Sequence, residues 1–229
     1  MDRDLQSIQE VRTLVKNAKE AQKKLRKYSQ EEIDRLVKVI ADACEQNSEH
    51  LAKMAVEETG FGIWQDKVVK NNLGSRMVYD YMKDLKTIGI INKDTRNKVM
   101  EVAVPVGVVA ALIPSTNPTS TTIFKALISL KGGNTIIFSP HPNARKCIRE
   151  TVDIMIKAAN SAGAPADIIQ CIDLVTSEAI DTLLKHRDVA VILATGGEAM
   201  VRAAYRSGNP AIGVGPGNGP AFIEKSADI

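Results

Sequence analysis

The 229-residue sequence is poor in cysteine and has no long apolar run, and each shortage excludes a class of protein. Its three cysteines, Cys44, Cys147 and Cys171, lie far apart without CxxC spacing, which argues against a disulfide framework and against a zinc site. No stretch approaches the roughly 18 consecutive apolar residues of a membrane span, and the acidic start MDRDLQSIQE lacks the apolar core of a signal peptide. The sequence therefore predicts a cytoplasmic protein without a bound metal or a membrane contact.

The sequence also lacks a large excess of either positive or negative charge. The 30 basic and 27 acidic residues are interspersed and leave a formal net charge of +3, so we expect no patch for nucleic acid and no membrane-binding surface. A hydrophobic content of 44% and a charged content of 25% are ordinary for a globular protein. The chain is long enough to bury a core without disulfides.

Helical periodicity dominates residues 1–87. Apolar side chains recur at helical spacing through residues 5–25. Ser29 followed by Glu32 forms a capping box, which predicts the start of a second helix whose apolar face includes Cys44.

Two further helices complete this segment. Ser48 is expected to cap a helix over residues 49–59 that ends at Gly60. A fourth helix is expected over residues 64–86.

The period changes in residues 88–104, where two short apolar segments flank the polar turn 92–97. This pattern predicts a β-hairpin. A hairpin arm of this kind, outside a core, often meets another subunit.

From residue 105 onward, strand and helix patterns alternate, which predicts a Rossmann-like α/β fold with a doubly wound, mostly parallel sheet. The expected strands are residues 106–113, 135–138, 168–172, 190–193, 211–214 and 221–224, and the expected helices are residues 119–130, 143–161, 177–185 and 198–206. Ligands of such sheets bind at the carboxyl ends of the strands.

One glycine turn at such an end is a candidate phosphate site. Thr195, Gly196 and Gly197 follow an apolar strand and precede a helix with Glu198 in its first turn. Backbone N–H groups freed at a helix start can hold a pyrophosphate, and glycine lets it approach closely. The alternative is a glycine turn required only for its backbone angles, and the spacing does not match GxGxxG.

Three other loop features admit two interpretations each. Asn117, in a proline-flanked turn, offers an amide donor to an oxyanion or forms an Asx-turn. His141, between two prolines, either contacts an anionic ligand or is an exposed loop histidine. The glycine-rich residues 213–220 either admit a substrate or form an irregular turn with several positive φ angles.

Three blocks of the sequence resemble the aldehyde dehydrogenase superfamily and, more narrowly, its CoA-acylating members, including the aldehyde dehydrogenase half of bifunctional aldehyde/alcohol dehydrogenases. They are AVEETGFGIWQDKVVKN, IPSTNPTSTTIFKALISLKGGNTIIFSPHP and ILATGGEAMVRAAYRSGNPAIGVGPGNGPAFIEKSADI. The resemblance implies that a small aldehyde, CoA and NAD⁺ are converted to acyl-CoA and NADH by a cytoplasmic protein whose full-length form is a homo-oligomer.

The resemblance also assigns residues. Asn117 matches the oxyanion-hole asparagine. Ser139 stands where hydrolytic relatives carry a lysine for the adenosine ribose, so the choice between NAD and NADP stays open. The residues expected at the cofactor are Ile113, Pro114, Ser115, Thr116, Ser139, Pro140, His141, Thr195, Gly196, Gly197 and Gly215.

Two departures from the family pattern change what is expected. Gly213, Val214, Gly215 and Pro216 stand where hydrolytic relatives carry the glutamate that activates water, which favours acyl transfer to a thiol. The family's nucleophilic cysteine lies beyond the SADI segment. Residues 1–229 are therefore expected to form a cofactor-binding domain without its catalytic domain, inactive alone. The alternatives are another reductase of the superfamily, acting on a semialdehyde or an acyl phosphate, and a non-catalytic oligomerisation module.

Overall fold

A five-stranded parallel sheet forms the centre of the computed structural model, which describes residues 2–215, 217 and 219–228. Its strand order is β5-β4-β3-β6-β7, and every pair in it is parallel. The strands are β3 (Val108–Leu112), β4 (Thr135–Ser139), β5 (Ile169–Cys171), β6 (Val189–Thr195) and β7 (Ala211–Val214). The predicted doubly wound parallel sheet is thereby confirmed.

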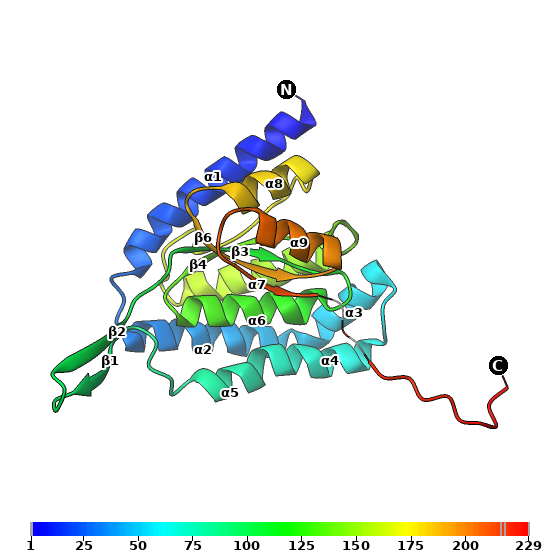
Figure 1. The fold of residues 1–229 in the computed structure, drawn as a ribbon, viewed down its shortest axis with the longest axis horizontal. Helices are drawn as coiled ribbons and strands as arrows, with labels where there is room; N and C mark the ends of the chain where they lie inside the picture. The colour runs from blue at the N-terminus through cyan, green and yellow to red at the C-terminus, as the bar shows by residue number, and fades with distance from the viewer. Residues whose placement is uncertain (1, 216, 218, 229) are drawn as a thin grey trace.

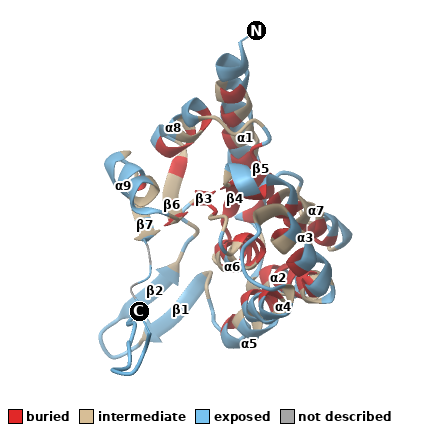
Figure 2. Cartoon of the chain, turned by 90° about the vertical axis from the view of Figure 1, so that its right-hand side faces the viewer, coloured by how far each residue is buried: buried red, intermediate tan, exposed pale blue. Residues whose placement is uncertain are grey.

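Helices cover both faces of this sheet (Figure 1). One face carries α6 (Pro118–Lys131) and α7 (Arg145–Ser161), and α2 (Gln30–Gln46) packs over them. The other face carries α1 (Arg3–Leu25), α8 (Ser177–Lys185) and α9 (Glu198–Arg206). Since β3 and β4 are buried on both sides, their apolar residues are consecutive rather than alternating, over all of β3 and over residues 136–138 of β4. Figure 2 shows the buried residues concentrated between these layers.

The starts of the N-terminal helices follow the capping rules, with one correction. The capping box at α2 is present: Ser29 Oγ accepts from the Glu32 N–H at 3.2 Å, and the Glu32 carboxylate accepts from the Ser29 N–H at 2.7 Å. The expectation that Ser48 caps the third helix is wrong. Because α3 (Ser48–Thr59) follows α2 directly, Asn47 both ends α2 and precedes α3, and Ser48 is already helical. Gly60 ends α3 at φ 69°, as expected.

The fourth predicted helix contains a wider turn. It comprises α4 (Trp64–Asn72), a π-helical turn (Leu73–Met77) and α5 (Val78–Met82), and it ends four residues earlier than expected. Gly74 lies in the π turn, where an added Cβ would come 2.8 Å from the Ser120 carbonyl oxygen. The missing side chain therefore allows this helix to pack closely against the start of α6.

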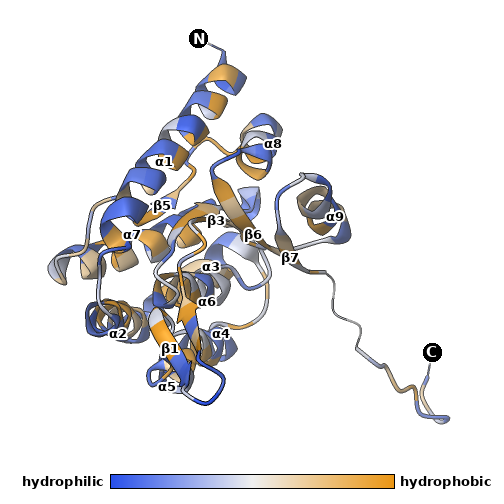
Figure 3. Cartoon of the chain, turned by 60° about the vertical axis from the view of Figure 1, so that its left-hand side comes forward, coloured by the Kyte–Doolittle hydropathy of each residue, from blue (hydrophilic) through white to orange (hydrophobic). Residues whose placement is uncertain are grey.

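The predicted hairpin is also present. β1 (Gly89–Asp94) and β2 (Val99–Ala103) pair antiparallel, and nearly all their residues are exposed (Figure 2). Hydrophobic residues stand along the hairpin (Figure 3), among them Ile91, Val99 and Met100, whose exposed fractions are 43%, 52% and 60%.

A sixth strand, predicted over residues 221–224, is absent from the part of the chain that the structure describes. Phe222 and Ile223 are 89% and 65% exposed. The described residues beyond β7 lead away from the sheet (Figure 1), so their backbone finds no strand to pair with. The apolar alternation in this segment therefore lacks the burial that stabilises a strand.

Candidate functional site at the carboxyl edge of the sheet

The strand order reverses between β3 and β6, and open α/β sheets bind ligands at such a point. The last paired residues of these strands are Leu112 and Ala194. Beyond them the Ile113 N–H donates to Ser139 O at 3.1 Å, toward β4. The Gly196 N–H donates to Val214 O at 3.3 Å, toward β7. The loop segments that follow β3 and β6 therefore turn toward opposite sides of the sheet. The loops predicted to bind the cofactor, residues 113–117, 139–141 and 195–197, all lie at this edge.

The helices that follow these two strands begin without a side-chain cap. Asn117 precedes α6 and its side chain accepts no bond from the first turn, and Gly197, which precedes α9, has no side chain to do so. Helix starts leave backbone N–H groups without partners and carry partial positive charge. Pro118 at the first position of α6 has no N–H, so the donors at that start are those of Thr119 and Ser120. Two helix starts without a side-chain cap therefore lie at the same edge, where backbone N–H groups can hold a pyrophosphate.

The other two helices that follow strands of the sheet have occupied starts. At α7 the Glu58 carboxylate accepts from the Lys146 N–H at 2.8 Å and from the Cys147 N–H at 2.7 Å. At α8 the Thr176 hydroxyl accepts from the Ala179 N–H at 3.0 Å. These side chains satisfy the groups that an anion would otherwise bind.

Neither glycine of the 195–197 turn is required by its backbone angles. Gly196 and Gly197 are not among the glycines with positive φ, and Gly197 has φ −64° and ψ 161°, which any residue adopts. An added Cβ at Gly197 would meet no atom within 4 Å. The alternative based on backbone angles is therefore wrong, and the absence of a side chain leaves the start of α9 accessible.

The described glycines of residues 213–220, a segment in which Pro216 and Asn218 lie outside the described residues, also lack the positive φ angles that were one interpretation of it. None of Gly213, Gly215, Gly217 and Gly219 has φ in the left-handed region. Gly213 is a packing requirement, because an added Cβ would come 2.6 Å from Val201 and 2.9 Å from the Tyr205 ring of α9. Gly215 has open space around it and is exposed.

Asn117 has a defined amide orientation. Lys70 of α4 donates from its ammonium to Asn117 Oδ1 at 3.0 Å. Because an ammonium can only donate, the amide oxygen faces Lys70 and the Nδ2 donor faces away. The Asx-turn alternative is not observed, since the side chain makes no capping bond. Nδ2 therefore remains available to an oxyanion, although the predicted role itself stays a prediction.

Three lysines that the sequence reasoning missed surround this turn. Lys67 donates to Thr116 O at 2.8 Å, Lys70 bonds Asn117, and Lys125 donates to the carbonyl oxygens of Leu112 and Leu193. Among the described residues none of the three pairs with a carboxylate. Burial and the neighbouring Lys70 charge lower the pKa of Lys67. The signal that could have found Lys125 is a lysine inside the otherwise apolar pattern TIFKAL.

The remaining predicted cofactor residues occupy mixed positions. Ile113, Ser139 and Pro140 are buried, whereas Thr116 is exposed and His141 is half-buried. His141 Nδ1 accepts from the Asn143 N–H at 3.1 Å, which opens a 3-10 turn (Pro142–Ala144) before α7. The helix expected from residue 143 thus begins at Arg145. Pro114, Ser115 and Thr195 are half-buried at the same edge.

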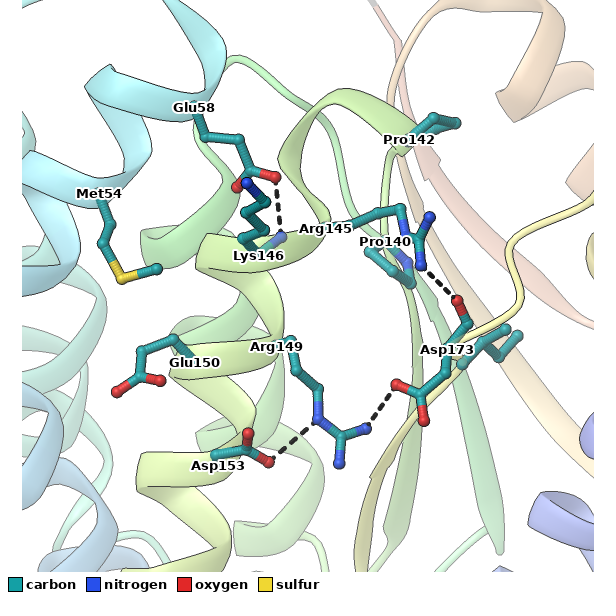
Figure 4. Close-up of a pocket in the computed structure, with 11 residues that line it drawn as sticks. Met54, Glu58, Pro140, Pro142, Arg145, Lys146, Arg149, Glu150, Asp153 and Asp173 are labelled. Atoms are coloured by element: carbon teal, nitrogen blue, oxygen red, sulfur yellow. Dashed lines mark hydrogen bonds and ion pairs between the residues drawn. The ribbon is translucent and has the colours of Figure 1, made fainter.

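A surface pocket of about 550 Å³ lies beside the start of α7, between α3 and the end of β5. Figure 4 shows the Arg149 guanidinium between two carboxylates of this pocket, with contacts to Asp153 at 3.1 Å and to Asp173 at 3.0 Å. Arg145 donates to Asp173 O at 2.8 Å. Because Glu58 occupies the adjacent helix start, this pocket does not offer the free donors found at α6 and α9.

All three cysteines are free and buried. Burial raises the pKa of Cys44 and of Cys171 to about 12. Burial and the Glu58 carboxylate raise the pKa of Cys147 above its ordinary value. A nucleophilic cysteine needs an accessible thiolate, so none of the three has that character. The described residues contain no helix long and apolar enough to cross a membrane.

Comparison with known proteins identifies the family. Residues 4–229 match the aldehyde dehydrogenase family. The chain belongs to this family. It is 46% identical over 223 residues to the bifunctional aldehyde-alcohol dehydrogenase AdhE of Escherichia coli K12, covering 97% of this chain and 25% of that protein.

Solved structures of aldehyde dehydrogenases share the fold over the whole chain. A probable aldehyde dehydrogenase from Listeria monocytogenes EGD-e is 64% identical with a TM-score of 0.95. An acetylating aldehyde dehydrogenase from Geobacillus thermoglucosidasius is 56% identical with a TM-score of 0.94. Both alignments cover 100% of this chain and 50% of the other. A propionaldehyde dehydrogenase from Rhodopseudomonas palustris with bound propionyl-CoA is 31% identical, with a TM-score of 0.80 over 91% of this chain and 46% of that one. The chain thus spans half or less of the length of these relatives.

Proposed function

We propose that this chain binds NAD(H) and CoA for a CoA-acylating aldehyde dehydrogenase, in which a small aldehyde, CoA and NAD⁺ give acyl-CoA and NADH. The observation that carries the proposal is the pair of uncapped helix starts, at α6 and α9, on the two strands where the sheet order reverses. A dinucleotide and CoA both contain a pyrophosphate, which these backbone donors suit. The similarity to an acetylating aldehyde dehydrogenase and to a propionaldehyde dehydrogenase with bound propionyl-CoA supports the acylating chemistry.

The residues at the edge have separate roles in this proposal. When bound, NAD⁺ accepts the hydride from the aldehyde carbon, and CoA takes the acyl group as a thioester. Asn117 Nδ2 donates to the oxyanion that forms when a thiolate adds to the aldehyde carbonyl. The bond from Lys70 to Asn117 Oδ1 fixes the amide in the orientation that leaves Nδ2 facing away from Lys70. Thr195, Gly196 and Gly197 leave the start of α9 open to the pyrophosphate.

Transfer to a thiol rather than to water is supported by the end of β7. Gly213, Val214 and Gly215 carry no side chain that can deprotonate a water molecule. The three cysteines are buried with raised pKa values, so none is the nucleophile of the reaction. We therefore expect residues 1–229 alone to bind ligands without turnover. Aldehyde-dependent NADH formation by the purified 229-residue chain would contradict this expectation.

Titration calorimetry with NADH and with CoA tests the proposed function. Heat with both ligands is expected. Binding of NADH without CoA would favour a reductase that acts on a semialdehyde or an acyl phosphate. No heat with either ligand would favour a non-catalytic oligomerisation module. Substituting Gly197 by valine should weaken the binding of NADH strongly if α9 is the pyrophosphate site, because the side chain would stand at its open start.

The hairpin supports a homo-oligomer as a further part of the proposal. Its apolar side chains, such as Val99 and Val102, are more than half exposed and lie outside both hydrophobic cores. Exposed apolar surface of this kind marks an interaction site. Sedimentation equilibrium of the native chain and of a Val99→Lys, Val102→Lys variant should show an assembly that the two charges dissociate; identical masses would exclude the hairpin as the contact.

A further inference from the structure

Lys125 is a buried ammonium group located where β3 and β6 stop pairing. Its side chain comes from the middle of α6 and the residue is 3% exposed. Nζ lies 2.8 Å from Leu112 O of β3 and 2.8 Å from Leu193 O of β6. Leu112 and Ala194, the residue after Leu193, form the last pair between these strands. The ammonium thus joins two strands at the end of their ladder.

The two hydrogen bonds of Lys125 form a bridge between β3 and β6, and the loops that follow these strands diverge beyond it. After Leu112 the backbone bonds toward β4, and after Ala194 it bonds toward β7. No further backbone bond between β3 and β6 fixes the spacing of the turns at residues 113–117 and 195–197. These turns precede α6 and α9, whose open starts form the proposed nucleotide site. The spacing of the two helix starts therefore depends on what joins the strand ends.

The Lys125 ammonium has no carboxylate partner among the described residues. Burial is the only cause that lowers its pKa, to about 7. The strands β3 and β6 contain no titratable side chain. On α6 the other lysine, Lys131, pairs with Asp34, and Lys67 and Lys70 of α4 bond the turn at residues 116–117. A charged donor makes a hydrogen bond roughly twice as strong as a neutral one, so the bridge weakens when the ammonium loses its proton.

The geometry points to Lys125 as a positioning residue for nucleotide binding: its ammonium holds the ends of β3 and β6 at the spacing that the two open helix starts need. This inference rests on the proposed nucleotide function. It makes nucleotide affinity depend on pH, because only the protonated bridge is charge-assisted. Affinity falls as the pH rises through the pKa of Lys125.

Fluorescence titration with NADH at pH 6, 7, 8 and 9 tests the inference on the whole chain. The native chain should bind about tenfold more weakly at pH 9 than at pH 6. Lys125→Met should bind at pH 6 as weakly as the native chain at pH 9, with no change across the series. Lys125→Arg keeps the charge at every pH, so its affinity for NADH should stay at the native pH 6 value throughout the series. Lys131→Met, which removes the other buried lysine of α6, is the matched control and should keep the native pH profile.

His141 is a predicted cofactor residue at the same edge, so His141→Gln is measured in parallel; a pH dependence that disappears in His141→Gln and persists in Lys125→Met would overturn the inference. A native profile that is flat from pH 6 to 9 would overturn the inference, as would a Lys125→Met variant that keeps the native fall. If Lys125→Met does not fold, as judged by circular dichroism, the native and Lys125→Arg profiles decide. Absence of NADH binding at every pH would instead overturn the proposed function, and the inference with it.

Discussion

The four helices that follow strands of the sheet form two contrasting pairs. The starts of α7 and α8 are closed by Glu58 and Thr176. The starts of α6 and α9, on the two strands at the reversal point, are open. All four share the same geometry, so helix position alone does not make a binding site. The difference teaches that tertiary capping decides which helix starts remain available to a ligand.

The basic side chains beside α6 and α7 also differ in their partners. Beside α7, Arg149 is paired with Asp153 and Asp173 within the pocket of Figure 4. Beside α6, Lys67 and Lys70 bond a carbonyl and an amide oxygen instead of carboxylates. Arg149 is thus ion-paired, whereas Lys67 and Lys70 have no carboxylate partner among the described residues, so an anionic ligand at the start of α6 would benefit from their charge.

The largest predicted effect comes from obstructing an open start. Gly197→Val is compatible with φ −64° and ψ 161°, so the chain should fold normally. The new side chain stands over the start of α9, and NADH should bind about a hundredfold more weakly, equivalent to about 2.7 kcal/mol. Calorimetry measures the affinity and thermal melting checks the fold.

Gly163→Ala is the matched control for this substitution. Gly163 lies after α7 with φ 76°, where a side chain is strained. This variant should lose about 1 kcal/mol of stability and keep its NADH affinity. A normal NADH affinity in Gly197→Val would exclude α9 as the binding helix.

Opening a closed start should have the second largest effect. Glu58→Ala leaves the Lys146 and Cys147 N–H groups without their acceptor and should lower the free energy of unfolding by about 2 kcal/mol. NADH affinity should not change, since α7 is not part of the site. Urea unfolding measures the stability, and Glu58→Gln, which keeps an acceptor oxygen, should recover part of the loss. A large drop in NADH affinity for Glu58→Ala would contradict the separation of the two pairs.

The pH dependence of stability gives a third test. The pKa of Lys125 is about 7 in the folded chain and 10.5 in its ordinary state, so between these values only the unfolded chain holds the proton. Stability therefore rises with pH across this window, by at most about 1.4 kcal/mol per pH unit. Urea unfolding at pH 7, 8 and 9 should show a steeper rise for the native chain than for Lys125→Met. Parallel curves would show that Lys125 keeps its proton in the folded chain.

The smallest effect is expected at α8. Thr176→Val removes the hydroxyl that caps the Ala179 N–H and contacts Ser7 Oγ at 2.7 Å. It should lower the free energy of unfolding by about 1 kcal/mol without affecting NADH affinity. Thr176→Ser retains the cap and should be close to native in thermal melting; an equal loss in both variants would mean that the cap contributes nothing.

Local patterns predicted most elements of the fold, because the strands and helices of the sheet have strong periodicity and clear ends. The capping box at Ser29 and the stop at Gly60 are local signals of this kind. The strand expected over residues 221–224 failed because a strand needs a neighbour to pair with, which local pattern does not reveal.

The candidate site was predictable only in part. Thr195, Gly196 and Gly197 carry a local signal, a glycine pair between strand and helix. The bonds of Glu58 to α7 and of Lys70 to Asn117 join residues 88 and 47 positions apart, so no local pattern contains them. Which helix starts are open is therefore a tertiary property that the sequence alone did not show.

Amide chemical shifts of the isotope-labelled chain during NADH addition test the central claim most directly. The N–H signals of Gly197, Glu198 and Ala199 at α9, and of Thr119 and Ser120 at α6, should move together with saturation. Those of Lys146 and Cys147 at α7 should stay in place. Movement at α7 with unchanged signals at α6 and α9 would contradict the account.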